Sequence, residues 1–398
     1  MGAYPKIARY FNRDIFINNI AMIILGTGIT GSGRANYLNE TMKYSGRFGR
    51  IVNLIDVGPQ MFTKASSLRV EIPGDKILDL DETALRFLRA TVFEGILHGI
   101  EDFRGAKSEK DLYISLHMSF RWKKVLMPAF DYYYVTQVNP DILVAIIDSV
   151  GNIRRRIDRD EDLHHWRNKL TVKEILIWQD EEIFITKMVA DILDKSFYIV
   201  PSSNINFRKP DPSILYDIIY EYEIPIQLGE KPRKRRAYLS YPMTHIEDRD
   251  EYFKMKDEFL EKLRKNNIIV FDPIMVEDHI LLDAVSSINS EDEYVYIEEF
   301  DVEIPAREII DAKDYIIDST VNRDYRFIDQ SDMVIVFYPT KHLSAGVLSE
   351  MNYGFTHMKR VYTYFTESDI SPFFKNYSNY ISNDVDDLIN RIVEDFEL

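Results

Sequence analysis

Short apolar runs alternate with longer helix-like segments along nearly the whole chain, and this alternation limits the possible folds more than any other feature. In the first half, five apolar runs have the length of strands: residues 20–26, 51–56, 112–116, 142–147 and 197–201. Two longer segments between them have the length and spacing of helices: residues 81–102 and 171–194. Strands that alternate with helices form βαβ crossovers and pair in parallel. The first half therefore predicts an α/β domain with a mostly parallel sheet.

The same alternation returns in the second half. Strands are predicted at residues 237–241, 268–272, 333–338 and 361–365, and helices at 247–265, 305–318 and 346–357. Between the two series lie a predicted helix near residues 212–222 and the basic run GEKPRKRR, which indicates a solvated linker. We expect two α/β domains, residues 1–204 and 237–398, joined by a helix and linker at 205–236. Residues 275–302 are acidic and irregular, which indicates an insertion or a lid.

Composition narrows the classes of function. The 398 residues include 49 Lys and Arg against 65 Asp and Glu, a net charge of −16, so we expect neither general nucleic-acid binding nor binding to anionic membranes. The chain has no cysteine, which excludes disulfides, thiolate metal sites and a cysteine nucleophile. No apolar run approaches the roughly 18 residues of a membrane span, and the first residues lack a signal-like apolar region, so a cytoplasmic protein is expected. The residue usage hints at a thermophile, and no histidine spacing indicates a metal site.

A glycine-rich loop, GTGITGSGRAN, joins the first predicted strand to a helical pattern. Compared with the phosphate-loop template, Gly28 and Gly33 occupy the two glycine positions, and Gly31 lies between them. Such glycines allow backbone N–H groups to surround an anion at a helix N-terminus. Arg34 replaces the lysine of the template, and Ala35 replaces the hydroxyl residue that binds magnesium. The loop therefore predicts binding of ATP or another nucleotide without efficient phosphoryl transfer.

The surroundings of this loop carry a resemblance to a known family. The strand DLYISLH, the strand NPDILVAIID and the basic run IRRRIDRD follow the loop in order. In this order residues 20–203 resemble the adenylate kinase-like branch of nucleoside monophosphate kinases, particularly the archaeal kind. The resemblance implies a P-loop-type parallel-sheet domain, in which lid arginines neutralise the phosphates; the matching candidates are Arg154, Arg155, Arg156 and Arg159. Two alternatives are a solvated arginine face and a degenerate kinase fold with a structural role only.

A second motif follows the predicted strand 333–338. It reads PTKHLSAGVLSE and places Ser344 and Gly346 at a helix N-terminus, with Glu350 further along the same helix. In open α/β sheets ligands bind at the carboxyl ends of the strands, and a helix N-terminus suits a phosphate. A carboxylate beside a bound sugar phosphate can attack C1′ or stabilise an oxocarbenium-like transition state. Asp324 offers a second acid, and Tyr238 on the strand 237–241 can orient a carboxylate.

Together these residues resemble the nucleoside 2-deoxyribosyltransferase superfamily, over about residues 236–366. The resemblance implies a Rossmann-like (flavodoxin-like) domain in which Glu350 is the nucleophile, Asp324 is the acid or the ribose-binding partner, and Tyr238 orients Glu350. Ser344 and Gly346 are more similar to the 2′-deoxynucleoside 5′-phosphate N-hydrolase branch, where a serine binds the 5′-phosphate. The superfamily commonly completes its sites across a dimer, so the resemblance also implies a homodimer or higher oligomer. It implies no cofactor for the glycosidase.

The sequence thus predicts an enzyme that cleaves or transfers the N-glycosidic bond of a (deoxy)nucleoside 5′-phosphate. A nucleoside monophosphate kinase with an accessory domain and a non-catalytic nucleotide sensor are the alternatives. Three further predictions concern single residues or runs. Asp332 is expected to have a structural role next to the strand 333–338, and the run Tyr132–Tyr134 to pack in the core, with base stacking as the alternative. His245 is expected at the surface, with substrate contact as the alternative.

Overall fold

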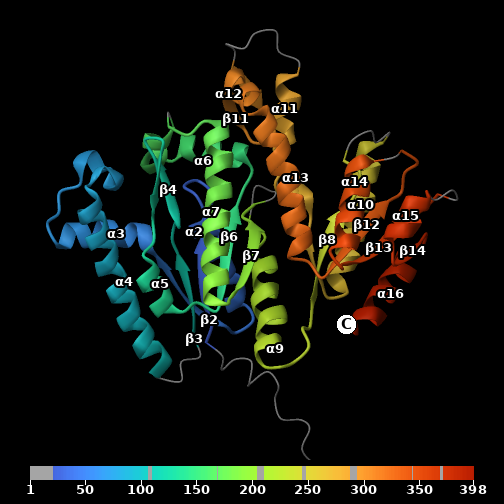
Figure 1. Ribbon diagram of the computed structural model, residues 1–398, viewed down its shortest axis with the longest axis horizontal. Coiled ribbons are helices and arrows are strands. Elements are labelled where there is room, and N and C mark those ends of the chain that lie inside the picture. Colours follow the sequence, from blue (N-terminus) through green and yellow to red (C-terminus); the bar gives the residue numbers. More distant parts are fainter. Residues whose placement is uncertain are drawn as a thin grey trace, which may run out of the picture. The chain divides into compact units, whose positions relative to one another are not determined.

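The computed structural model describes residues 21–105, 110–167, 169–203, 210–243, 248–286, 294–342, 344–367 and 371–398. Over these residues the chain forms two parallel five-stranded sheets flanked by helices, together with two short antiparallel hairpins (Figure 1). The predicted α/β class is therefore confirmed. None of the described helices combines the length and the apolarity that a membrane crossing requires.

The first sheet has the strand order β2-β3-β1-β6-β7. Its strands are β1 (Ile23–Thr27), β2 (Ile51–Asp56), β3 (Lys110–Ser115), β6 (Ile142–Ile147) and β7 (Ser196–Pro201). The accompanying helices are α2 (Arg34–Gly46), α3 (Val57–Ser67), α4 (Glu82–Gly105), α5 (Tyr132–Val138), α6 (Val150–Arg159) and α7 (Val172–Leu193). All residues of β1 and β6 are buried, because a parallel strand in the middle of a sheet is covered on both faces. Their continuous apolar runs are the reason that the sequence predicts them well.

Two elements of this half do not follow from the sequence predictions. A hairpin of β4 (Ser119–Trp122) and β5 (Val125–Pro128) was not predicted. Residues 132–134 lie on the short helix α5, where Tyr132 and Tyr133 are exposed. Core packing is therefore wrong for these two, because they lie on the outer side of an amphipathic turn. Tyr134 alone packs inward, with its ring stacked 5.7 Å from that of Phe93.

The second sheet has the strand order β14-β13-β12-β8-β9. Its strands are β8 (Arg235–Ser240), β9 (Ile268–Phe271), β12 (Met333–Tyr338), β13 (Arg360–Phe365) and β14 (Tyr380–Ser382). The helices are α8 (Pro212–Asp217), a π-helix (Ile218–Glu223), α9 (Ile224–Gln227), α10 (Arg249–Lys265), α11 (His279–Val285), α12 (Ala306–Asp311), α13 (Lys313–Asp329), α14 (Ala345–Thr356), α15 (Pro372–Tyr377) and α16 (Val385–Phe396). Numbered within this half, the order is 2-1-3-4-5. The connections reverse between β8 and β12, and ligands bind at such a switch point, beyond the carboxyl ends of the strands.

Three segments of this half differ from the predictions. The helix predicted at 305–318 is two helices, α12 and α13, which meet at Ala312. The segment 275–302 is not irregular in its described parts, since it contains α11 and leads into the hairpin of β10 (Tyr294–Ile297) and β11 (Val302–Pro305). In this hairpin exposed and buried residues alternate, and that period of two is the signal that the sequence reading missed.

The basic run at 229–236 is only partly a linker, because its last two residues belong to β8. The guanidinium group of Arg236 lies 3.8 Å from the ring centre of Tyr222 and donates to Asp332 over 2.8 Å. Asp332 also accepts the backbone N–H of Arg236. Asp332 therefore has the structural role that was expected. Arg236 is held by Asp332 and Tyr222 and is not a solvated linker charge.

Contacts group the described chain into two compact units. The first unit comprises residues 21–28, 34–145 and 184–197, and the second comprises residues 29–33, 146–183 and 198–398 with their gaps. Glu350 and the other residues of the candidate active site all lie in the second unit.

Candidate active site

Glu350 lies on α14, the helix that follows β12. Its Oε1 accepts a hydrogen bond from the Tyr238 hydroxyl over 3.0 Å, and its Oε2 accepts one from the Ser240 hydroxyl. Both donors are buried on β8, which pairs in parallel with β12. The half-buried Glu350 is thus held at the switch point between these two strands. The structure brings Tyr238 to Glu350 as the sequence predicted. Ser240 was missed, although residues two apart on a strand face the same side.

Two neighbouring residues of α13 add an ion pair. Asp324 and Arg323 are both buried, and Arg323 Nη2 lies 3.4 Å from Asp324 Oδ1. The buried Nε of Arg323 has no hydrogen-bond partner among the residues that the structure describes. Unpaired buried donors are rare in folded proteins and call for a physical explanation. Sequence reasoning missed Arg323, because an arginine on an amphipathic helix usually faces solvent.

The two carboxyl groups influence each other's ionisation. Burial raises the pKa of Glu350, and the negative charge of Asp324 raises it further. The hydrogen bonds from the Ser240 and Tyr238 hydroxyl groups lower it in part. Burial also raises the pKa of Asp324, against the positive charge of Arg323. Each carboxylate disfavours the ionisation of the other, so the pair keeps a proton to higher pH than two isolated carboxyl groups. Such a pair can present one acid and one base to a substrate.

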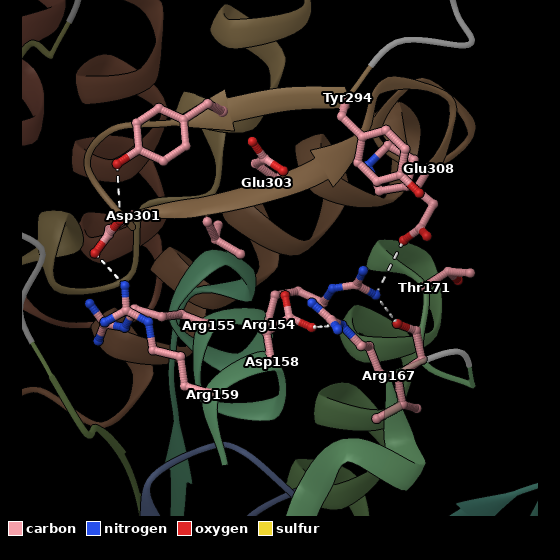
Figure 2. Close-up of a pocket in the computed structure, with 14 residues that line it drawn as sticks. Arg154, Arg155, Asp158, Arg159, Arg167, Thr171, Tyr294, Asp301, Glu303 and Glu308 are labelled. Carbon is pink, nitrogen blue, oxygen red and sulfur yellow. Dashed lines mark hydrogen bonds and ion pairs between the residues drawn. The ribbon is translucent and has the colours of Figure 1, made fainter. Parts of the chain in front are cut away.

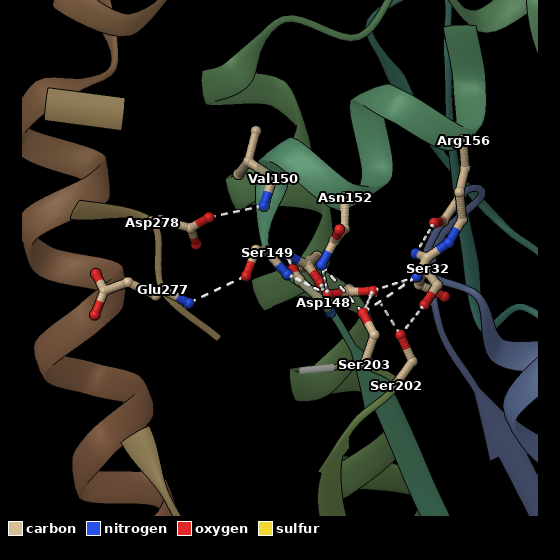
Figure 3. A network of polar contacts seen from close by, with 12 residues as sticks. Ser32, Asp148, Ser149, Val150, Asn152, Arg156, Ser202, Ser203, Glu277 and Asp278 are labelled. Carbon is tan, nitrogen blue, oxygen red and sulfur yellow. Dashed lines mark hydrogen bonds and ion pairs between the residues drawn. The ribbon is translucent and has the colours of Figure 1, made fainter. Parts of the chain in front are cut away.

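The acidic surroundings of Arg323 extend to a neighbouring loop, shown in Figure 3. Asp278 is buried, and its Oδ1 accepts the backbone N–H of Val150 at the start of α6 over 2.7 Å. Burial raises the pKa of Asp278 to about 7, while the positive charge of Arg323 opposes the rise. The neighbouring N–H of Glu277 donates to the Ser149 hydroxyl over 3.1 Å. The N-terminus of α6 is therefore attached to the loop that faces Arg323.

The predicted phosphate ligands lie at the start of α14. Ser344 caps this helix, since its hydroxyl accepts the N–H of Val347 over 3.4 Å. The N–H of Ser344 donates to the hydroxyl of Tyr338, the last residue of β12, over 2.6 Å. Gly346 is exposed in the first turn of the helix. Ser344, Gly346 and Glu350 are thus on one helix, as the spacing predicted.

The glycine loop contains two left-handed residues, Gly31 (φ 80°) and Gly33 (φ 79°). Arg34 is buried, and its guanidinium group donates to the carbonyl of Gly28 over 2.6 Å and to the Ser115 hydroxyl over 2.8 Å. These contacts turn Arg34 back toward the protein, whereas a phosphate-loop lysine extends toward the phosphates.

Arg156, one of the predicted lid arginines, also points at this loop. Its Nη1 donates to the carbonyl of Gly31 over 2.7 Å, and its Nη2 donates to Asp148 over 2.5 Å. Asp148 is fully buried and collects further donors from the Ser149 N–H, Asn152, Ser202 and Ser203 (Figure 3). The other predicted lid arginines, Arg154, Arg155 and Arg159, line a separate pocket. The structure therefore does not bring the four arginines together.

His245 lies outside the described residues. Within the described ranges there is no group of three or more His, Asp or Glu side chains placed to hold a metal ion. No family model matches the chain, and a search of curated proteins finds no match to it.

Proposed function

We propose that the second half of the chain cleaves or transfers the N-glycosidic bond of a (deoxy)nucleoside 5′-phosphate. The observation that carries the proposal is the Glu350 carboxylate, which two buried hydroxyl groups orient at the switch point of the sheet. The strand order 2-1-3-4-5 is also that of flavodoxin-like folds. It agrees with the Rossmann-like domain that the resemblance to nucleoside 2-deoxyribosyltransferases implies.

The chemistry requires a carboxylate close to the anomeric carbon. As the bond between C1′ and the base nitrogen breaks, the electron pair leaves with the base and positive charge develops at C1′. Glu350 bonds to C1′, or stabilises that charge, more strongly in the transition state than in the ground state. Water or a second base then attacks C1′, displaces the carboxylate and restores Glu350. Tyr238 and Ser240 prevent rotation of the carboxylate, so it does not have to be aligned during the reaction.

Asp324 is the candidate for the general acid that protonates the departing base. The departing base needs a proton, and burial raises the pKa of Asp324 to about 6, which brings the protonated form closer to neutral pH. Arg323 moderates this effect, because its charge stabilises the ionised form of Asp324. We therefore assign proton donation to Asp324, and contact with the sugar hydroxyls is the alternative role.

The 5′-phosphate is assigned to the start of α14. The first N–H groups of a helix have no partner within the helix, and the helix dipole favours an anion there. Ser344 and Gly346 lie at this end, and Glu350 lies further along the same helix. Binding of the phosphate can therefore align C1′ with the carboxylate.

For the first half we propose nucleotide binding at the glycine loop without efficient phosphoryl transfer. Arg34 donates to Gly28 and Ser115, and Ala35 has no hydroxyl for magnesium. These two features weigh against the kinase alternative, since phosphoryl transfer depends on a lysine at the phosphates and a bound magnesium ion.

The direct test is to incubate the protein with a panel of nucleotides and nucleosides and to measure free base by chromatography. Base release from one or more 5′-monophosphates, faster than from the matching nucleosides, is expected. Ser344→Asp separates the two roles of this residue, because aspartate caps a helix as well as serine does but repels a phosphate. This variant should lose the preference for 5′-phosphates and keep its melting temperature. If no nucleotide in the panel loses its base, the proposed function is wrong.

A further inference from the structure

A second site is suggested by a pocket of about 770 Å³ between α6 and the hairpin β10–β11 (Figure 2). Its volume is typical of pockets that bind small molecules. All of its lining residues belong to the second compact unit. Its wall contains four arginines, two exposed tyrosines and four carboxylates, which are Asp158, Asp301, Glu303 and Glu308.

Four arginines line the pocket: Arg154, Arg155, Arg159 and Arg167. Arg159 pairs with Asp301, and Arg167 pairs with Asp158 over 2.7 Å. A guanidinium group has five N–H donors, and a pair through one of them leaves others that can bind a phosphate. Arg156, on the same helix as three of these arginines, does not line the pocket and donates to the carbonyl of Gly31 in the glycine loop instead.

The most informative arginine is Arg154. Its Nη1 donates to the carbonyl of Leu170 over 2.5 Å and lies 3.5 Å from Glu308. Its Nε is buried and has no hydrogen-bond partner among the described side chains and backbone. Arg154 as a whole is only 6% exposed. A buried donor without a partner carries a desolvation penalty. A ligand oxygen bound in the pocket would accept its hydrogen bond and remove that penalty.

Aromatic surface covers the same pocket. Tyr294 and Tyr296 of β10 are 69% and 57% exposed, although both line the pocket. The neighbouring strand β11 contributes Glu303, whose side chain has no hydrogen bond or ion pair with the rest of the described chain. Figure 2 shows Glu303 and Tyr294 on the side opposite the arginines. The pocket thus has arginines on one wall, three of them paired with the lining carboxylates Glu308, Asp301 and Asp158, and on the other wall an aromatic ring with Glu303, which is unpaired among the described residues.

We propose that this pocket binds a guanine nucleoside diphosphate or triphosphate, at a site separate from Glu350. The arginines would bind the phosphates, because guanidinium groups suit the geometry of phosphate oxygens. Tyr294 would stack on the base. Glu303 would accept from the two adjacent N–H groups on the Watson–Crick edge of guanine, whereas adenine has only its exocyclic amino group to donate. The proposal adds a ligand site to the chain and does not depend on base release at Glu350.

The test is isothermal titration calorimetry of the full chain with GDP, ADP, guanosine and pyrophosphate. GDP should bind at least about tenfold more tightly than ADP, and both guanosine and pyrophosphate should bind more weakly than GDP. Glu303→Gln should remove the preference for GDP over ADP. Tyr294→Ala should weaken both nucleotides by about tenfold or more, and Arg159→Gln should weaken GDP and pyrophosphate. Arg86→Gln, at an exposed arginine far from this pocket in sequence, is the matched control and should change nothing.

The outcomes separate the parts of the proposal. Melting curves of the variants establish that each is folded. Arg159 loses its ion pair with Asp301 and the control Arg86 loses one with Asp131, whereas Glu303 and Tyr294 form no ion pair with the described residues. GDP binding that is unchanged in Tyr294→Ala and Arg159→Gln places the nucleotide elsewhere and overturns the site. Equal affinities for GDP and ADP in the wild type overturn the assignment of Glu303. If neither GDP nor pyrophosphate binds, the proposal is wrong, and the pocket is only a polar contact between α6 and the hairpin.

Discussion

The glycine loop and the Glu350 site are both at the carboxyl ends of parallel strands, but their charged groups are satisfied very differently. Near the loop, the carboxylate of Asp148 accepts five hydrogen bonds, and Arg156 donates to Asp148, to the Ser203 hydroxyl and to the Gly31 carbonyl. At the other site, the pKa values of Glu350 and Asp324 are both raised. The Nε of Arg323 there has no partner among the described residues.

This difference supports the proposed location of the chemistry. A network in which every charge has its partner stabilises a structure and leaves little for a substrate to gain. Carboxyl groups with raised pKa values beside an incompletely paired cation are typical of catalytic sites, although structural networks can also shift pKa values. On this comparison we propose the Glu350 site as the place of the chemistry and a binding or structural role for the loop.

The largest expected effect is that of Glu350→Gln. The substitution keeps the size of the side chain and the acceptor for the Tyr238 hydroxyl but removes the charge that, in the proposed mechanism, stabilises C1′. Base release should fall by about 10²-fold or more, measured by chromatography with nucleotide binding followed separately. Glu258→Gln, at an exposed position on α10, is the control and should have full activity. Full activity in Glu350→Gln would remove Glu350 from the mechanism.

The arginines of the two regions offer a matched pair of variants. Arg323→Gln leaves Asp324 and Asp278 buried without their cation and should lower the free energy of unfolding by about 3 kcal/mol. Arg156→Gln should cost only about 1 kcal/mol, because Asp148 keeps four other donors. Urea denaturation measures both. Equal losses in the two variants would contradict the comparison.

Asp278 predicts a pH dependence of stability. Its pKa in the folded protein is raised to about 7, above the ordinary value of about 3.9 in the unfolded chain. The folded state therefore binds the proton more tightly, and stability falls as the pH rises from about 4 to about 7. Asp278→Asn keeps an acceptor for the N–H of Val150 and removes this loss. The variant should be more stable than the wild type at pH 8, by up to about 4 kcal/mol for a pKa raised from about 3.9 to about 7, with a smaller difference at pH 4. A difference that does not change with pH in thermal unfolding would refute this.

Tyr238→Phe tests the orientation of the carboxylate. The ring stays in the core, but Glu350 loses the donor at 3.0 Å. A hydrogen bond to a charged group contributes about 1.5–3 kcal/mol, so kcat should fall by about tenfold or more while KM changes little. Tyr241→Phe, which removes a buried hydroxyl that donates to Asp272, is the control for a structural loss. If both variants lose the same activity, the Tyr238 hydroxyl has no special part in catalysis.

The smallest effect is expected at the glycine loop. Transfer of phosphate from ATP to nucleoside monophosphates should stay at background in the presence of magnesium, and Arg34→Gln should not change base release. A coupled assay for ADP measures the transfer. Rapid transfer by the wild type would reverse the comparison and favour the kinase alternative.

The sequence by itself determined the α/β class, the approximate position of most strands and the presence of Glu350 on the helix after β12. These features are local, because a buried parallel strand needs a continuous apolar run and a helix needs its own periodicity. The sequence also indicated Tyr238, which the structure brings to Glu350. The roles of these residues in a reaction remain predictions.

Only the tertiary structure decided which charges meet. Ser240 reaches Glu350 through the pairing of β8 with β12, and the packing of α13 buries Arg323 together with its sequence neighbour Asp324. Arg154 and Arg156 lie on one helix, yet Arg154 pairs with Glu308 of α12 and Arg156 donates to the glycine loop. The physical reason is that the ionisation and the hydrogen bonds of a buried charge depend on neighbours distant in sequence, and these are set only when the chain is folded.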